Sequence, residues 1–354
     1  MPLTSRQGES GGPTSSPTPW SSWPPKPHPT SPVTPCRSTA ASCRGCFEGR
    51  GTRAVPRFAG PVSFEERIRA GWGGRAGAYL ELTKPGITIF VAVTAVAAYV
   101  LAAIPAVDLP ALLHLVAGIT LSTAGSLALN QYLERRPDSV MLRTRGRPVP
   151  SGRIRARHAR LFGWLLILAG IGHLWFWLGW LPALITAIAA LLYDGVYTPL
   201  KLRSALATPV GAVPGALPAL IGWTAHTEAI DARGMTLFGI LFLWQLIHVL
   251  ALGWNLRRDY ERAGFQLIPP GSDRLIAGLM VGHAAALLPL SVVPRVLGMS
   301  GSVYLAGALV LGGGMLAVSV AFMLDPTKQR CSRVFLGSLL YHPLLLGVMV
   351  AGAL

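Results

Sequence analysis

Three oxygen-bearing side chains recur at intervals of four residues in one stretch of the chain: Asn130, Glu134 and Asp138. On a helix this spacing places all three on one face. Amide and carboxylate oxygens are the ligands that Mg²⁺ prefers, and the ion is often held partly by substrate phosphates. The spacing therefore predicts a site for magnesium together with a phosphorylated substrate.

Arginines gather directly after this acidic group and again near residue 260. Arg143, Arg145 and Arg147 precede Pro-Val-Pro-Ser-Gly, and guanidinium groups hold anions such as diphosphate by charge-assisted hydrogen bonds. The second group combines two carboxylates with three arginines: Asp259 and Glu261 with Arg257, Arg258 and Arg262. The alternative is that each group forms only surface ion pairs, which contribute little to stability and bind no ligand.

The composition restricts the protein to a membrane. Of the 354 residues, 51% are hydrophobic and only 13% are charged, whereas soluble domains carry roughly a quarter charged residues. The apolar residues form long runs, each about long enough to cross a bilayer core. The net charge of +16 would suggest nucleic acid in a soluble protein, but most Arg and Lys lie in short segments between apolar runs. We therefore expect no nucleic-acid partner.

Nine apolar segments predict an all-α, polytopic membrane protein, since each helix satisfies its own backbone hydrogen bonds in lipid. Only Gly179 and Trp180 separate the third and fourth segments, which predicts a tight helical hairpin. The predicted spans lie near 87–105, 109–130, 159–179, 181–197, 207–225, 235–255, 274–294, 301–323 and 334–353.

Every second connection between these spans is strongly basic. By the positive-inside rule, the N-terminus and the basic loops are cytoplasmic or matrix-facing, and the C-terminus lies outside. Both carboxylate and arginine groups then fall on the same membrane face, where they predict one diphosphate–metal site. Residues 1–76 form a Pro/Ser/Arg-rich extension that we expect to be disordered, before a transmembrane domain over 77–354.

The residues from Asn130 to Gly152 resemble the first acidic motif of the UbiA-type prenyltransferase superfamily. Further stretches resemble, more narrowly, the protoheme IX farnesyltransferases (haem O synthases). These are Leu82-Thr-Lys84-Pro85, Tyr197-Thr-Pro199-Leu-Lys201, the Gly/Pro-rich run 211–223, Trp244-Gln245-Leu-Ile-His248 with Asp259-Tyr260, and the run 338–345. The resemblance covers about residues 78–354 and implies a UbiA-like helical bundle.

The resemblance implies transfer of a farnesyl group from farnesyl diphosphate to a vinyl group of haem B, giving haem O and diphosphate. Mg²⁺ would be held by the residues that we also expect to be catalytic: Asn130, Glu134, Asp138 and Asp259. Diphosphate would be bound by Arg143, Arg147, Lys201 and Arg203, and haem would be contacted by His248. Tyr132, Tyr193 or Tyr197 would stabilise the allylic cation through their ring faces.

The expected location is the bacterial inner membrane, with the mitochondrial inner membrane as the alternative. A haem A synthase or an oxidase-assembly protein is the implied partner. The sequence departs from the family where Arg136 and Arg258 replace usual Asp residues, and Pro137 interrupts the helix. Two other functions stay open: prenyl transfer to an aromatic or quinone-precursor acceptor, and a non-catalytic membrane protein or transporter that keeps the fold.

Overall fold

The structure, a computed structural model, describes residues 74–268 and 271–353, and every regular element within them is helical. The predicted extension over 1–76 lies outside these residues except for its last positions. The long helices are α3 (Pro85–Ala103), α4 (Leu109–Leu133), α6 (Ala156–Leu178), α7 (Trp180–Ala190), α9 (Ala207–Thr227), α10 (Ala232–Asn255), α12 (Asp273–Val296), α13 (Ser302–Leu324) and α14 (Lys328–Ala351).

Short helices complete the described chain. They are α2 (Arg75–Leu82), α5 (Arg135–Val140), the π-helix η1 (Leu191–Tyr197), α8 (Thr198–Leu200) and α11 (Arg257–Arg262). α7, η1 and α8 follow one another without a break, so they act as one span over Trp180–Leu200.

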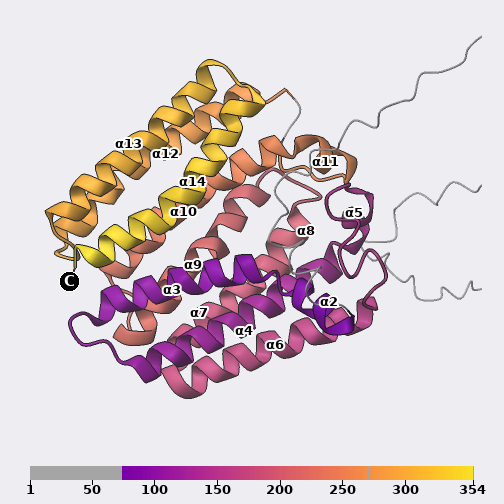
Figure 1. Ribbon diagram of the computed structural model, residues 1–354, viewed down its shortest axis with the longest axis horizontal. Coiled ribbons are helices and arrows are strands. Elements are labelled where there is room, and N and C mark those ends of the chain that lie inside the picture. The colour runs from indigo at the N-terminus through magenta and orange to yellow at the C-terminus, as the bar shows by residue number, and fades with distance from the viewer. Residues whose placement is uncertain (1–73, 269–270, 354) are drawn as a thin grey trace, which may run out of the picture. The chain divides into compact units, whose positions relative to one another are not determined.

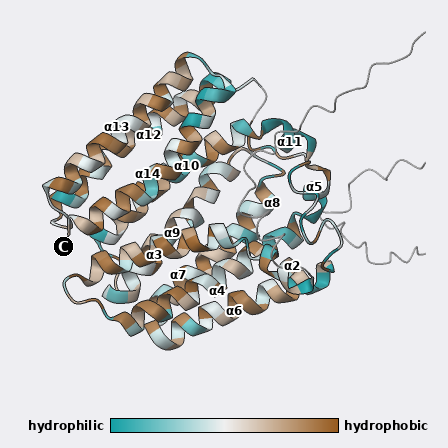
Figure 2. Cartoon of the chain, viewed as in Figure 1, coloured by the Kyte–Doolittle hydropathy of each residue, from teal (hydrophilic) through white to brown (hydrophobic). Residues whose placement is uncertain are grey.

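The nine predicted spans are confirmed as helices, with shifts of a few residues at their ends. Eight are long and apolar enough to cross a membrane, and hydrophobic residues run along their length (Figure 2). The ninth, α9, contains no charged residue but is less hydropathic than the others, because proline, glycine and threonine interrupt its apolar residues. The chain is a multi-pass membrane protein.

The predicted hairpin between the third and fourth spans is also present. α6 ends at Leu178 and α7 begins at Trp180, so Gly179 alone makes the turn. Its φ of +88° lies in the left-handed region, which a residue without Cβ adopts at little cost.

Small residues allow the helices to approach closely, as is common in membrane bundles. α9 packs against α3, α7 and α10, and a Cβ added at Gly222 would collide with the backbone carbonyl of Ala95 on α3. On the other side of the bundle, Gly125 of α4 faces the backbone of Gly163 on α6. Larger residues at these positions would force the helices apart.

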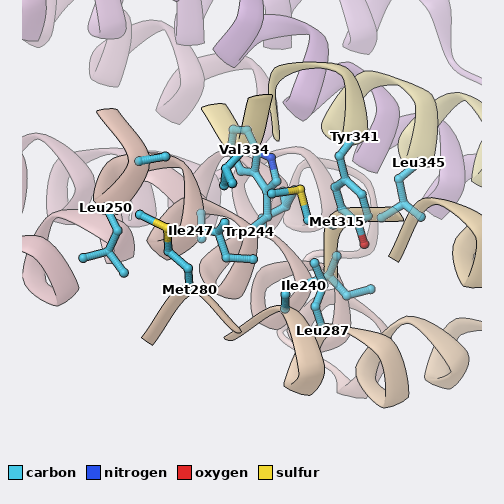
Figure 3. Close-up of a cluster of buried hydrophobic side chains, with 14 of the residues drawn as sticks. Ile240, Trp244, Ile247, Leu250, Met280, Leu287, Met315, Val334, Tyr341 and Leu345 are labelled. Atoms are coloured by element: carbon cyan, nitrogen blue, oxygen red, sulfur yellow. The ribbon is translucent and has the colours of Figure 1, made fainter. Parts of the chain in front are cut away.

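Large apolar side chains fill the space between α10, α12, α13 and α14. Figure 3 shows Trp244 and Ile247 of α10 in one cluster with Tyr341 of α14 and Leu287 of α12. The indole Nε1 of Trp244 donates to the carbonyl of Ser338 at 2.6 Å, so its one polar group is satisfied within the apolar cluster.

The short helices α2, α5, α8 and α11 gather at one end of the bundle (Figure 1). A small apolar cluster ties this end together: Met141 after α5 packs with Ala263 and Phe265 after α11. The backbone N–H of Gln266 also donates to the carbonyl of Lys201 at 2.7 Å. Connections that are far apart in the sequence therefore meet at one end, where the polar motifs lie.

Candidate active site

The acidic group stands where α4 gives way to α5. Glu134 separates the two helices, yet its N–H donates to the carbonyl of Asn130 and its own carbonyl accepts from the N–H of Asp138, each at 2.8 Å. These bonds keep the helical spacing of four residues across the break. All three side chains are buried, and Asp138 is 0% exposed. Pro137 lies within α5, where it does not displace them.

A basic side chain meets each member of this group. Lys201 Nζ lies 2.7 Å from Glu134 Oε1. Arg147 Nη1 donates to both carboxylate oxygens of Asp138, at 3.0 and 2.8 Å. Lys84 Nζ donates to Asn130 Oδ1 at 3.4 Å. The three bases come from segments far apart in the sequence, so only the fold brings them to the acidic group. We call these six buried or partly buried side chains the polar layer: Lys84, Asn130, Glu134, Asp138, Arg147 and Lys201.

Lys84 is the functional candidate that the sequence analysis did not place in the site. It precedes Pro85, and a residue before proline is disfavoured in the α region. Here it takes a left-handed conformation with φ +45°, directly before α3. Its signal in the sequence was its position before Pro85, within the run 82–85 that carries the family resemblance.

The charges in this layer influence one another strongly. Burial, reinforced by the charge of Arg147, lowers the pKa of Lys84 to about 7, although Glu134 and Asp138 act in the opposite sense. Burial also opposes the charges of Lys201 and Glu134. Their mutual attraction overcomes it, so the pKa of Lys201 is raised well above its usual value and that of Glu134 is lowered. Lys84 can thus gain a proton when an anion arrives.

Tyr197 and Thr198 complete one wall of the layer. Lys201 Nζ lies 4.2 Å from the centre of the Tyr197 ring, which in turn lies 5.6 Å from the Tyr193 ring. Asn130 Nδ2 donates to Thr198 Oγ1 at 3.1 Å. Tyr132, the third tyrosine predicted to face the cation, has the guanidinium carbon of Arg135 4.5 Å from the centre of its ring.

The second predicted group lies at the same end of the bundle but is less enclosed. Asp259 on α11 pairs with Arg262 at 3.6 Å, and its side chain is 21% exposed. Burial raises the pKa of Tyr260, its neighbour, and charges on Lys201 and Arg143 act on that tyrosine. The connections that carry Asp138 and Asp259 pack together, because Met141 and Phe265 belong to one apolar cluster.

The remaining residues predicted to bind diphosphate are exposed to solvent at this end of the bundle. Arg143 and Arg203, predicted to bind diphosphate, are exposed, as are the departures Arg136 and Arg258. The two substituting arginines are thus exposed, whereas Glu134 and Asp138 are buried. Within residues 74–268 and 271–353, no three His, Cys, Asp or Glu side chains lie close enough to hold a metal by themselves.

His248 lies inside α10, two to three turns before α11. Its Nδ1 is 2.9 Å from Ser338 Oγ, and that hydroxyl donates to the carbonyl of Phe335 at 2.6 Å. Because the serine hydrogen is directed at Phe335, Nδ1 of His248 carries the proton and Nε2 keeps its lone pair. The ring is stacked between Trp244 and Phe335, which fixes its orientation.

Residues 91–343 match the UbiA prenyltransferase family, which is most of the chain. The chain belongs to the UbiA prenyltransferase family. One relative, protoheme IX farnesyltransferase of Solibacter usitatus (strain Ellin6076), is 41% identical over 283 residues, covering 77% of this chain and 97% of the relative. Another of the same name, from Opitutus terrae, is 38% identical and covers 77% and 93%.

Solved structures agree with this family in fold. A digeranylgeranylglyceryl phosphate synthase structure superimposes with a TM-score of 0.69 at 18% identity, over 79% of this chain and 98% of that one. A UbiA homologue from Archaeoglobus fulgidus, bound to GPP and Mg²⁺, gives 0.51 at 15% identity, over 77% and 99%. At such identities the comparison establishes the helical arrangement alone.

Proposed function

We propose that this UbiA-family member transfers the farnesyl group of farnesyl diphosphate to a vinyl group of haem B, giving haem O. The observation that supports this proposal most is that two relatives named protoheme IX farnesyltransferase are 41% and 38% identical to this chain and are covered over 97% and 93% of their length. The buried polar layer at one end of the bundle supports the same reaction class.

The layer suits a diphosphate because its cations already stand in low-dielectric surroundings. Lys201 and Arg147 neutralise Glu134 and Asp138 in the structure. An arriving diphosphate offers these cations denser negative charge, so they turn to it and release the two carboxylates. Lys84, whose pKa is about 7, adds a further charge by taking up a proton.

The donor set fits a magnesium ion bound together with the diphosphate. Asn130, Glu134 and Asp138 supply one amide and two carboxylates, the oxygen ligands that Mg²⁺ takes alongside substrate phosphates. Asp259 lies on the adjoining connection and would complete the set. When bound, Mg²⁺ supplies Lewis-acid stabilisation of the departing diphosphate. Arg143 and Arg203 would meet the diphosphate at its exposed side.

The reaction breaks the bond between farnesyl C1 and the diphosphate oxygen, and the electron pair leaves with diphosphate. C1 then bonds to the outer vinyl carbon of haem, which leaves a cation on the inner vinyl carbon. Water adds to that carbon and loses one proton. Preorganised Lys84, Arg147 and Lys201 stabilise the leaving group, and the faces of Tyr193 and Tyr197 suit the allylic cation.

His248 is the proposed haem contact. Its Nδ1–H is held by Ser338, so the Nε2 lone pair is available to the haem iron. Iron ligands of this type generally donate their other ring N–H to a protein acceptor. His248 also lies on the helix that leads to Asp259, since α10 is followed directly by α11.

The proposed location is the bacterial inner membrane, with the polar layer facing the cytoplasm, because the basic connections gather at that end. The product is a membrane-bound haem, so a haem A synthase or an oxidase-assembly protein is the proposed partner.

The test is to express the chain in cells that lack a haem O synthase and to identify extracted haems by mass spectrometry. Haem O is expected, and it should disappear in the Lys201→Met variant. Well-inserted protein that yields no haem O would overturn the proposal. Farnesyl transfer to an aromatic quinone precursor in a parallel assay would then support a prenyltransferase with that class of acceptor. Transfer to neither haem B nor the quinone precursor would support a non-catalytic role.

A further inference from the structure

Asp194 is a buried carboxylate that the proposed reaction has not yet used. It is 8% exposed, and neither of its oxygens has a hydrogen-bond partner in the structure. The other buried carboxylates of the described chain, Glu81, Glu134 and Asp138, each pair with a basic side chain. Burying a carboxylate without a partner is costly, so an orphaned one points to a ligand or water that supplies the missing donors.

Asp194 lies in the π-helical segment η1, and such segments occur frequently at functional sites. Four residues later, Thr198 accepts a hydrogen bond from Asn130. Four residues before Asn130 stands Ser126, which is close enough to Asp194 to interact with it, though not in hydrogen-bonding geometry. Ser126 and Asp194 therefore face each other one turn deeper in the bundle than Asn130 and Thr198.

This place is where the reacting carbons would lie. With the diphosphate at Lys84, Arg147 and Lys201, the apolar chain of the donor must extend toward the interior of the bundle. The allylic carbons directly follow the diphosphate, so they fall at the depth of Asp194. The charges of Glu134, Lys84 and Lys201 act on Asp194, which places it near the layer.

We propose that Asp194 binds the water molecule that adds to the cationic intermediate and accepts its proton. This inference rests on the proposed function. The intermediate carries its positive charge on the inner vinyl carbon, and the water oxygen bonds to that carbon. One water proton passes to Asp194. The electron pair of the broken C–O bond has already left with the diphosphate, so the charges balance. Ser126 holds the same water from α4.

The test uses full-length protein in lipid nanodiscs with farnesyl diphosphate, MgCl₂ and haem B. In Asp194→Asn, the rate of haem O formation should fall about 10²–10⁴-fold, as for loss of a general base. The affinity for farnesyl diphosphate should stay within about threefold, since Asp194 does not touch the diphosphate. The remaining product should include farnesylated haem that is lighter by one water, because the intermediate then loses a proton instead.

A second readout separates this role from a structural one. Replacing an unpaired buried carboxylate by an amide should raise the melting temperature, whereas removing a structural anchor would lower it. Asp231→Asn is the matched control: this exposed residue caps α10 at the opposite end, and asparagine can still cap. It should leave turnover unchanged.

Wild-type turnover in Asp194→Asn would overturn the proposal, as would a loss of turnover explained entirely by weaker farnesyl diphosphate binding or a lower melting temperature. Failure of the proposed function is distinct, since the wild-type protein itself would then make no haem O.

Discussion

The buried ion pair between Lys201 and Glu134 gives the sharpest test of the site's energetics. Nζ and Oε1 are 2.7 Å apart, and the two side chains are 11% and 9% exposed. Lys201→Met leaves Glu134 buried without a partner. Removing one member of such a pair costs about 3–5 kcal/mol of stability.

The double variant should recover much of this loss. Glu134→Gln removes the carboxylate that needs neutralising, so Lys201→Met with Glu134→Gln leaves no unpaired charge. We expect a coupling free energy of about 2–4 kcal/mol in a double-mutant cycle. Unfolding in lipid bicelles measures the four free energies. Because the pKa of Glu134 is lowered in the folded state, the coupling should persist at neutral pH and disappear in acid below its usual 4.5.

Arg330 and Asp325 provide the matched control. They form an exposed pair at 3.3 Å, with side chains 36% and 53% exposed, and the same cycle should give less than about 1 kcal/mol. Additive effects of Lys201→Met and Glu134→Gln, with coupling no larger than in the control pair, would refute the claim that the site rests as a neutralised buried pair.

Other predictions concern titration and packing. Lys84 has a folded pKa of about 7 against its usual 10.5, so the unfolded chain binds more protons between these values and the free energy of unfolding should rise with pH over that window by a few kcal/mol. Lys84→Met should abolish the rise in a pH series of unfolding measurements. Gly222→Ala, which meets the α3 backbone, should cost about 1–3 kcal/mol, whereas Gly278→Ala, which meets open space, should cost little in the same assay. Trp244→Phe removes the bond to Ser338 and should lower stability by about 1–3 kcal/mol, while equal melting temperatures would show that this bond contributes nothing.

Much of the fold could be predicted because a bilayer imposes strong rules on sequence. The length of each apolar run predicted a membrane-spanning helix, and Gly179 predicted the turn of the hairpin. The π-helical segment was not predicted, since nothing in the sequence Leu-Leu-Tyr-Asp-Gly-Val-Tyr distinguishes a π-helix from an α-helix, and the two differ in their hydrogen-bond pattern.

The site was predicted in part, for a reason of sequence distance. Asn130, Glu134 and Asp138 are close in sequence, so helical spacing could group them. Their partners Lys84 and Lys201 lie more than 40 residues away, and only the fold shows which acid meets which base. The metal, diphosphate and haem roles of the named residues remain predictions.

The π-helical segment also gives the chain one place where its length can change. A π-helix holds nearly one more residue in a turn than an α-helix. Deleting a single residue from Leu191–Tyr197 would let the span run as a regular α-helix and would leave the helical parts on either side in nearly the same orientation. The same deletion within a regular α-helix would rotate one part against the other by about 100°, so descendants could lose one amino acid here with far less disturbance of the bundle than elsewhere in a span.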